Sequence, residues 1–138
     1  AAGQLCVVMG YSGDINIARQ RAIDTKSGHD IQALIPPSGA TLFFDSMAIP
    51  KDAPHPKNAH LFINYIMRPE VHASLTNKVF YANPNTASKK FVAKAVAENP
   101  TIFLTAADMK KLTPPDAVPQ DIRRVQTRIF TGFKAGAK

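Results

Sequence analysis

Tryptophan is absent from this chain of 138 residues, and cysteine occurs once, as Cys6. A single cysteine cannot form a disulfide within the chain, so cysteine usage does not indicate the redox state of the protein's compartment. Because Cys6 lies between Leu5 and Val7, we expect a buried and unreactive thiol.

Long apolar runs are also absent, since none approaches the roughly 20 residues needed to cross a membrane. Residues 1–9 have neither the positive start nor the cleavage pattern of a signal peptide. The chain starts almost inside a strand-like run and without an initiator methionine, which indicates a piece of something longer. With 45% hydrophobic and 20% charged residues, the composition is that of one folded domain.

Acidic residues are few, with ten against 17 lysines and arginines, and the net charge is +7. Such a charge raises nucleic acid as a possible partner. Ten of the basic residues lie in residues 89–138, however, with no interleaved aromatic pattern and no known nucleic-acid motif. We therefore expect a solvated basic surface and no nucleic-acid partner, although tight and salt-dependent DNA binding would favour the alternative.

Three short extended segments are predicted. Leu5–Met9 is an apolar run that ends at Gly10, Ile31–Ile35 is stopped by Pro36-Pro37, and Thr41–Ile49 is stopped by Pro50. The mixture of strands and helices predicts an α/β fold. Three strands make a thin sheet for this number of helices, which again indicates missing chain.

Helices are predicted between and after these strands. Ser12 or Asp14 can cap a helix that continues to about Ile23. Apolar residues at positions i, i+3, i+4 and i+7 from Ala59 to Ile66 predict a second helix, and Arg68-Pro69-Glu70 separates it from a third. Further helices are expected over residues 91–96 and 108–112 and, after a proline-rich surface connection over residues 113–119, along the apolar face of Ile122, Val125, Ile129 and Phe133.

Two segments place aromatic rings beside a carboxylate, Tyr11-Ser12-Gly13-Asp14 and Phe43-Phe44-Asp45. No Lys or Arg occurs in residues 1–18 or 27–50. This combination suits an organic ammonium ion, because a hydrogen bond to a charged carboxylate contributes about 1.5–3 kcal/mol and a ring face about 0.5–2 kcal/mol. The structural alternative is that Asp14 only caps a helix and Phe43 belongs to the core.

Enzymatic chemistry has weaker support. The order of strand, Gly10-Tyr11-Ser12-Gly13 and helix is similar to a hydrolase elbow, but the G-x-S-x-G pattern requires glycine where Asp14 stands. His55 and His60 are separated by Pro56 and do not share a helix face, so the histidines form no metal pattern. We expect no catalysis and no cofactor, and Ser12 is interpreted as a cap or a ligand-contacting hydroxyl. A serine hydrolase is the remaining enzymatic alternative.

A diamine needs one anionic group for each ammonium and apolar walls between them, where each buried methylene contributes about 0.8 kcal/mol. Asp14 and Asp45 can supply the two anionic groups. Tyr11, Phe43 and Tyr81 can form the walls, and both phenol hydroxyls can also hydrogen-bond. Phe44 is expected to alternate to the opposite face of its strand and to pack in the core.

Five stretches carry a resemblance to a known family, in chain order and over essentially all 138 residues: Val8–Asp14, Gly39–Pro50, Phe62–Val71, Val79–Asn83 and Arg123–Arg128. The chain resembles the C-terminal portion of the periplasmic polyamine-binding proteins of bacterial ABC transporters, which are receptors for putrescine and spermidine. The resemblance implies a periplasmic, non-enzymatic solute-binding component whose partners are a polyamine and a membrane permease. A receptor of the same fold for another cationic or amino-acid solute is the alternative.

The fold implied by this resemblance is a fragment of a two-lobed, type II-like α/β clamshell. Residues 1–35 would be part of the second lobe and carry Tyr11 and Asp14. Residues 36–82 would form the hinge crossing and part of the first lobe, with Phe43 and Asp45, and residues 83–138 would return to the second lobe. The family usually has Trp at the position of Tyr11. The family's N-terminal part is absent, so it or a second chain is expected to complete the fold and the site.

Overall fold

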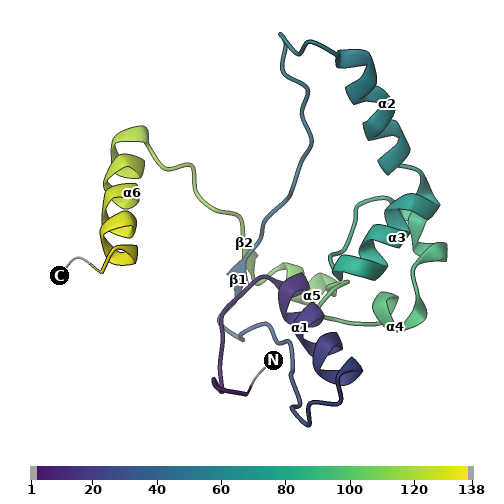
Figure 1. Ribbon diagram of the computed structural model, residues 1–138, viewed down its shortest axis with the longest axis vertical. Helices are drawn as coiled ribbons and strands as arrows, with labels where there is room; N and C mark the ends of the chain where they lie inside the picture. The colour runs from purple at the N-terminus through teal and green to yellow at the C-terminus, as the bar shows by residue number, and fades with distance from the viewer. Residues whose placement is uncertain (1–2, 137–138) are drawn as a thin grey trace.

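The computed structural model describes residues 3–136, and their regular structure is mostly helical with one small parallel sheet (Figure 1). Its elements are α1 (Ser12–Asp24), β1 (Ala40–Thr41), α2 (Pro56–Ile66), α3 (Pro69–Val79), the 3₁₀ helix η1 (Thr86–Phe91), α4 (Lys94–Ala97), α5 (Ala106–Met109), β2 (Leu112–Thr113) and α6 (Gln120–Lys134).

The longer helices lie where apolar spacing and start signals predict them. Helices α2 and α3 each begin with a proline, Pro56 and Pro69. Proline suits the first helical position, because its φ is already helical and no hydrogen bond is lost there. The predicted helices from position 12, from position 59 and after Pro69 are therefore confirmed, as is the helix that carries Ile122 to Phe133.

The core lies around α3, which contacts η1, α1 and α2. Ala73 of α3 packs with Val92, Val96 and Ile102, and all four are buried. Phe80 and Phe103 are partly buried against this cluster. The burial of these apolar side chains is the main stabilising contribution in this part of the chain.

A hydrogen-bonded turn closes the core beside α3. Asn83 donates to the Thr76 hydroxyl (2.8 Å) and accepts from the Ser88 hydroxyl (2.8 Å) and the Asn85 amide (3.0 Å). Thr76 and Ser88 are buried, so these bonds replace the water that their hydroxyls lose. The turn at Asn83-Pro84-Asn85 is thereby fixed to α3 just after Tyr81.

The sheet consists of β1 and β2, which run parallel with Ala40 opposite Leu112 and Thr41 opposite Thr113. The Leu42 amide donates to the Thr113 carbonyl (2.9 Å) and extends the pairing by one bond. Before β1, Gly39 has a φ of +100°, and a β-carbon there would overlap the carbonyl oxygen of Lys111. Glycine is thus needed for both backbone shape and close approach of the two strands.

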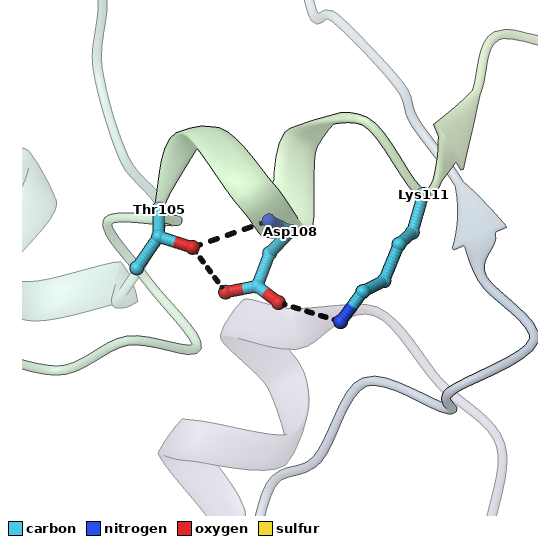
Figure 2. A network of polar contacts seen from close by, with 3 residues as sticks. All are labelled: Thr105, Asp108 and Lys111. Carbon is cyan, nitrogen blue, oxygen red and sulfur yellow. Dashed lines mark hydrogen bonds and ion pairs between the residues drawn. The ribbon is translucent and has the colours of Figure 1, made fainter.

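A polar network at α5 fixes the chain just before β2 (Figure 2). The Thr105 hydroxyl accepts from the Asp108 amide (3.1 Å) and donates to the Asp108 carboxylate (2.6 Å), while the Lys111 ammonium donates to the same carboxylate (3.2 Å). The hydrogen bonds from Thr105 and then Lys111 hold the pKa of Asp108 below its ordinary value. Thr105 is therefore the N-cap of this short helix.

Three strand predictions are wrong in whole or in part. Residues 5–9 and 31–35 contain no strand. Of the run predicted over residues 41–49, only Thr41 lies in a strand, as the second residue of β1. A strand requires hydrogen bonds to a neighbouring strand, and residues 3–136 supply a partner only through β2. The predicted α/β class is therefore confirmed only in part, because the structure is mostly helical and has one small parallel sheet.

Two predicted core positions are exposed for the same reason. Cys6 is exposed, and so are its neighbours Leu5 and Val7, so the prediction of a buried thiol is wrong. The Phe44 side chain is 75% exposed rather than packed in the core. Segments that lack a sheet have no second layer against which to bury such side chains.

Helix α6 lies apart from the other helices in Figure 1, at the end of the segment that follows β2. Its apolar residues Ile122, Val125, Ile129 and Phe133 are all exposed. The two short helices predicted over residues 91–96 and 108–112 are shifted. The first region contains η1 and then α4, and α5 ends at Met109, before β2. None of the helices within residues 3–136 is long and apolar enough to span a membrane.

Candidate functional site

The six residues predicted to contact a ligand lie on three segments. Tyr11 is the N-cap residue of α1, and Ser12 and Asp14 are in its first turn. Phe43 and Asp45 lie in the irregular segment after β1. Tyr81 follows the C-terminal end of α3.

The phenol of Tyr81 brings these segments together. Partial burial raises the pKa of Tyr81 above its ordinary value of 10.0, and the negative charge of Asp14 raises this pKa further. Asp45 and Tyr11 also raise the Tyr81 pKa, whereas a hydrogen bond with the Asp14 backbone lowers it. Both predicted carboxylates thus act on one hydroxyl, although they lie on different segments.

The Tyr11 and Phe43 rings are in contact with each other. Their centroids are 5.6 Å apart, and their planes are inclined at 80° in an edge-to-face arrangement. This geometry is favoured by the aromatic quadrupoles and contributes about 0.5–1.5 kcal/mol beyond area burial. Each ring still exposes more than half of its surface, 57% for Tyr11 and 55% for Phe43. The two rings therefore offer an accessible aromatic surface.

The carboxylates of Asp14 and Asp45 are not neutralised by cations of the described chain. Within residues 3–136, ion pairs link only Lys94 with Glu98 and Lys111 with Asp108. Both Asp14 and Asp45 are exposed. Two accessible negative charges beside aromatic rings can hold an organic cation, because ring faces and carboxylates both attract ammonium groups.

The first turn of α1 is held in place by a buried side chain, Asn16. Its amide donates to the Ser12 carbonyl (2.8 Å) and to the Thr101 hydroxyl (3.0 Å), and its side-chain oxygen accepts from Asn99 (3.1 Å). These bonds tie the start of α1 to a turn far along the chain. They therefore fix the backbone from which Asp14 projects.

Neither Ser12 nor Asp14 caps α1 through its side chain. The N-cap is Tyr11, and no side-chain cap hydrogen bond is formed there. The prediction of a cap at Ser12 or Asp14 is thus wrong, and the carboxylate of Asp14 is not committed to that purpose. Negative charge in the first turn is still favourable because of the helix dipole.

Tyr81 is positioned from both sides. On one side, Phe80 ends α3 in the left-handed region, with φ of +56°, and its amide donates to the Thr76 carbonyl (2.9 Å). On the other side, Asn83 is bonded to Thr76. An unfavourable φ at a phenylalanine is offset here by packing of Phe80 against the core. The chain direction at Tyr81 is consequently fixed.

Four residues that shape this region carried no ligand-binding signal in the sequence: Gly13, Asn16, Phe80 and Asn83. Gly13 is buried against the Tyr81 ring, and a β-carbon at Gly13 would overlap that ring. A glycine at a helix start and an asparagine inside a helix have several ordinary explanations. Only the turn signal at Asn83 could have indicated its structural part.

A hollow in the surface of the described chain lies elsewhere. It has a volume of about 380 Å³ and is bordered by α1, residues 32–33 and residues 95–101. None of the six predicted ligand-contacting residues lines it. Among residues 3–136, no group of three His, Cys, Asp or Glu side chains is placed to hold a metal ion.

The sequence profile of the family described as bacterial extracellular solute-binding protein matches residues 1–104. The chain is 42% identical over 137 residues to the putrescine-binding periplasmic protein SpuD of Pseudomonas aeruginosa, and 40% identical over 136 residues to the putrescine-binding periplasmic protein PotF of Escherichia coli. Each match covers 99% of this chain and 37% of the relative. The spermidine/putrescine-binding periplasmic protein of Escherichia coli is 30% identical over 78% of the chain.

The chain belongs to the bacterial extracellular solute-binding protein family. It spans about 37% of the length of the putrescine-binding relatives just described. The predicted resemblance to periplasmic polyamine-binding proteins is confirmed, and so is the expectation of a binding protein rather than an enzyme. The relatives are periplasmic proteins, in agreement with the predicted location.

Proposed function

We propose that this chain carries a large part of the polyamine site of a periplasmic solute-binding protein, with putrescine or spermidine as ligand. The observation that supports this most directly is that the Tyr11 ring contacts Phe43 and that Gly13 packs against the Tyr81 ring, which brings together the segments that carry Asp14 and Asp45. The names of its relatives agree with that ligand class.

The proposed binding mode gives each ammonium of a diamine its own carboxylate. Asp14 takes one ammonium and Asp45 the other. Each charge-assisted hydrogen bond contributes about 1.5–3 kcal/mol. The two carboxylates come from separate segments, α1 and the stretch after β1, so a ligand that contacts both holds those segments together.

Aromatic rings and hydroxyls complete this binding mode. Tyr11 and Phe43, already in edge-to-face contact, enclose the methylene chain of the ligand. Tyr81 adds a ring and a hydroxyl. A phenol is protonated at neutral pH, and the raised pKa of Tyr81 extends the protonated range further. Ser12, exposed at the start of α1, offers a second hydroxyl. Each methylene that the rings bury contributes about 0.8 kcal/mol.

We further propose the lobe assignment that follows from the resemblance. Residues 1–35 and 83–138 belong to one lobe of a clamshell, and residues 36–82 form the crossing and part of the other lobe. The bonds between Asn16 of α1 and both Asn99 and Thr101 support the first grouping, because they join its two segments. The two groups also meet, since Ala73 of the second group packs with Val92, Val96 and Ile102 of the first. A ligand that contacts both lobes drives closure only through its greater affinity for the closed form.

The complete receptor is proposed to need further chain, in proportion to the length of the relatives. Large apolar side chains such as Met9 (99% exposed) and Phe133 (77% exposed) call for a covering layer. That layer is either an additional segment of the same protein or a second chain, and it also supplies further ligand contacts. The 138 residues alone are expected to bind putrescine weakly, so micromolar affinity of this piece would refute the need for further chain. In the complete receptor, a membrane permease is the proposed partner.

Calorimetry with putrescine on the natural full-length product tests the function. Asp14→Asn and Asp45→Asn remove one anionic group each with little change of shape. Each is expected to weaken binding by about ten- to a hundredfold, from the value of a charge-assisted hydrogen bond. Asp52→Asn changes an exposed acid on the segment that carries Asp45 and is the control, with unchanged affinity expected. Full retention of binding in both site variants would reject the proposal.

A further inference from the structure

Gly13 lies against the ring of Tyr81, although the two residues are far apart in the sequence. It is one of the buried residues of α1. The three atoms closest to a β-carbon built on Gly13 are all ring carbons of Tyr81, and that β-carbon would overlap them. The aromatic ring therefore occupies the space that any other residue at position 13 would fill.

The backbone of Gly13 does not itself require glycine. Gly13 lies inside α1, and its φ is not in the left-handed region, where Gly3, Gly28, Gly39 and Gly136 are found. In a helix, alanine is more favourable than glycine, because glycine loses more backbone freedom on folding. The small size of Gly13, rather than its flexibility, is thus what the packing uses.

The backbone that carries the Tyr81 ring is held in place, so a larger residue at position 13 has to be accommodated by the ring itself. Its backbone is held by Phe80, whose amide donates to the Thr76 carbonyl (2.9 Å), and by Asn83, which donates to the Thr76 hydroxyl (2.8 Å). The facing turn of α1 is held equally firmly, since Asn16 is bonded to Ser12 and Thr101. Because both backbones are held, the size of the residue at position 13 determines how closely the Tyr81 ring approaches α1.

We infer that Gly13 is a positioning residue that seats the Tyr81 ring against the first turn of α1, so that the phenol stays within reach of the charges of Asp14 and Asp45. The inference rests on the proposed polyamine function, because the position of this hydroxyl matters for binding only if these groups hold the ligand. A larger residue at position 13 pushes the ring outward, into the space proposed for the methylene chain of a diamine.

Four variants of the natural full-length product test this role. Gly13→Ala adds the methyl group that meets Tyr81, and Gly10→Ala is the matched control, since its methyl would meet only the flexible end of Ile15 at 3.2 Å. Tyr81→Ala and the double variant Gly13→Ala with Tyr81→Ala complete a thermodynamic cycle. Gly13→Ala is expected to weaken putrescine binding by about tenfold, comparable to one hydrogen bond to a charged group. In the Tyr81→Ala background, the same change is expected to have no further effect. An equal loss in both backgrounds would overturn the inference.

A second measurement does not depend on any ligand. NMR titration of ring-labelled tyrosine, assigned with the Tyr81→Phe variant, reports the pKa of Tyr81 directly. Gly13→Ala is expected to move this pKa down toward 10.0, because the displaced phenol loses its burial and its proximity to Asp14. An unchanged titration curve would overturn the positioning role. If Gly13→Ala shifts the titration curve but the parent protein binds no putrescine, the positioning role is supported and the polyamine function is rejected.

Folding of the variants provides the last check. Gly13→Ala is expected to lower the thermal midpoint, and Tyr81→Ala is expected to restore it by removing the overlapping ring. If Tyr81→Ala does not restore the thermal midpoint of Gly13→Ala, the contact on which the inference depends is contradicted. The same holds if the double variant fails to fold while Tyr81→Ala alone folds.

Discussion

The ring of Tyr11 meets the ring of Phe43 edge to face, with centroids 5.6 Å apart and planes inclined at 80°. Tyr11 begins α1, whereas Phe43 follows β1, so the contact joins two segments that each carry one of the proposed ammonium-binding aspartates. The aromatic pair therefore helps to hold the segment of Asp14 next to the segment of Asp45.

The contribution of this pair is testable at Tyr11. Tyr11→Leu removes the ring but keeps apolar bulk, and putrescine binding is expected to weaken by about two- to tenfold, from the value of an aromatic pair. Tyr11→Trp enlarges the ring and is expected to strengthen binding, because indole attracts cations more strongly than phenol. Calorimetry on both variants provides the measurement.

The matched control for these variants is Tyr65→Leu, at an exposed tyrosine of α2. It is expected to leave putrescine affinity unchanged. A loss at Tyr65 as large as the loss at Tyr11 would show that the effect is not specific to the aromatic pair.

The titration of Tyr81 should report the two aspartates in a defined order. Because Asp14 raises the Tyr81 pKa more than Asp45 does, Asp14→Asn is expected to lower this pKa more than Asp45→Asn. A folded pKa above the ordinary 10.0 means that this phenol's contribution to stability is fully present below pH 10.0 and is lost as the pH rises through the folded value. NMR titration of labelled tyrosine measures both effects. A larger shift from Asp45→Asn would contradict the described geometry.

Removal of the Asn83 side chain should destabilise the fold. Asn83→Ala leaves the buried hydroxyl of Thr76 without its donor and deprives Ser88 of one of two acceptors. The expected loss in the free energy of unfolding is about 1–3 kcal/mol. Urea denaturation provides the measurement. Asn64→Ala, at an exposed position of α2, is the control and is expected to remain within about 0.5 kcal/mol of the parent. Equal effects of the two substitutions would argue against the Asn83 network.

The pairing of β1 with β2 should require Gly39 for its lack of a side chain as well as for its positive φ. Both Gly39 and Gly28 have positive φ, but a β-carbon meets the Lys111 carbonyl at Gly39 and open space at Gly28. Gly28→Ala is expected to cost about 1–2 kcal/mol from strain. Gly39→Ala is expected to cost about 1–3 kcal/mol more from overlap.

Urea denaturation compares these two variants, and hydrogen exchange of the Leu42 amide, which bonds to Thr113, locates the effect. Faster exchange in Gly39→Ala but not in Gly28→Ala is expected. If the two variants are equally stable and exchange alike, strand approach does not require glycine.

The helices could be predicted from the sequence, whereas the strands could not. Apolar spacing and proline starts define α2 and α3 locally, because helical hydrogen bonds form within one segment. Residues 5–9 look like a strand, but strand formation depends on a partner elsewhere in the chain. The same dependence explains why the prediction of a buried Cys6 was wrong.

The candidate site was predicted in its charged and aromatic residues but not in its supports. Asp14 and Tyr11 stand out because they place a carboxylate and an aromatic ring close together within residues 1–18, which contain no lysine or arginine. Gly13 and Asn16 do not stand out, since their importance arises from contacts with Tyr81 and Thr101, which are distant in the sequence. Ligand binding by the six predicted contact residues, Tyr11, Ser12, Asp14, Phe43, Asp45 and Tyr81, stays a prediction.

The most direct test compares putrescine with 1-aminobutane, which has the same carbon chain and one ammonium, by calorimetry on the natural full-length product and on Asp45→Asn. If Asp14 and Asp45 each hold one end of the diamine, the parent protein should prefer putrescine by at least about tenfold. The Asp45→Asn variant should bind the two amines within about threefold of each other, because the second carboxylate is gone. An undiminished preference for the diamine in Asp45→Asn would contradict the account.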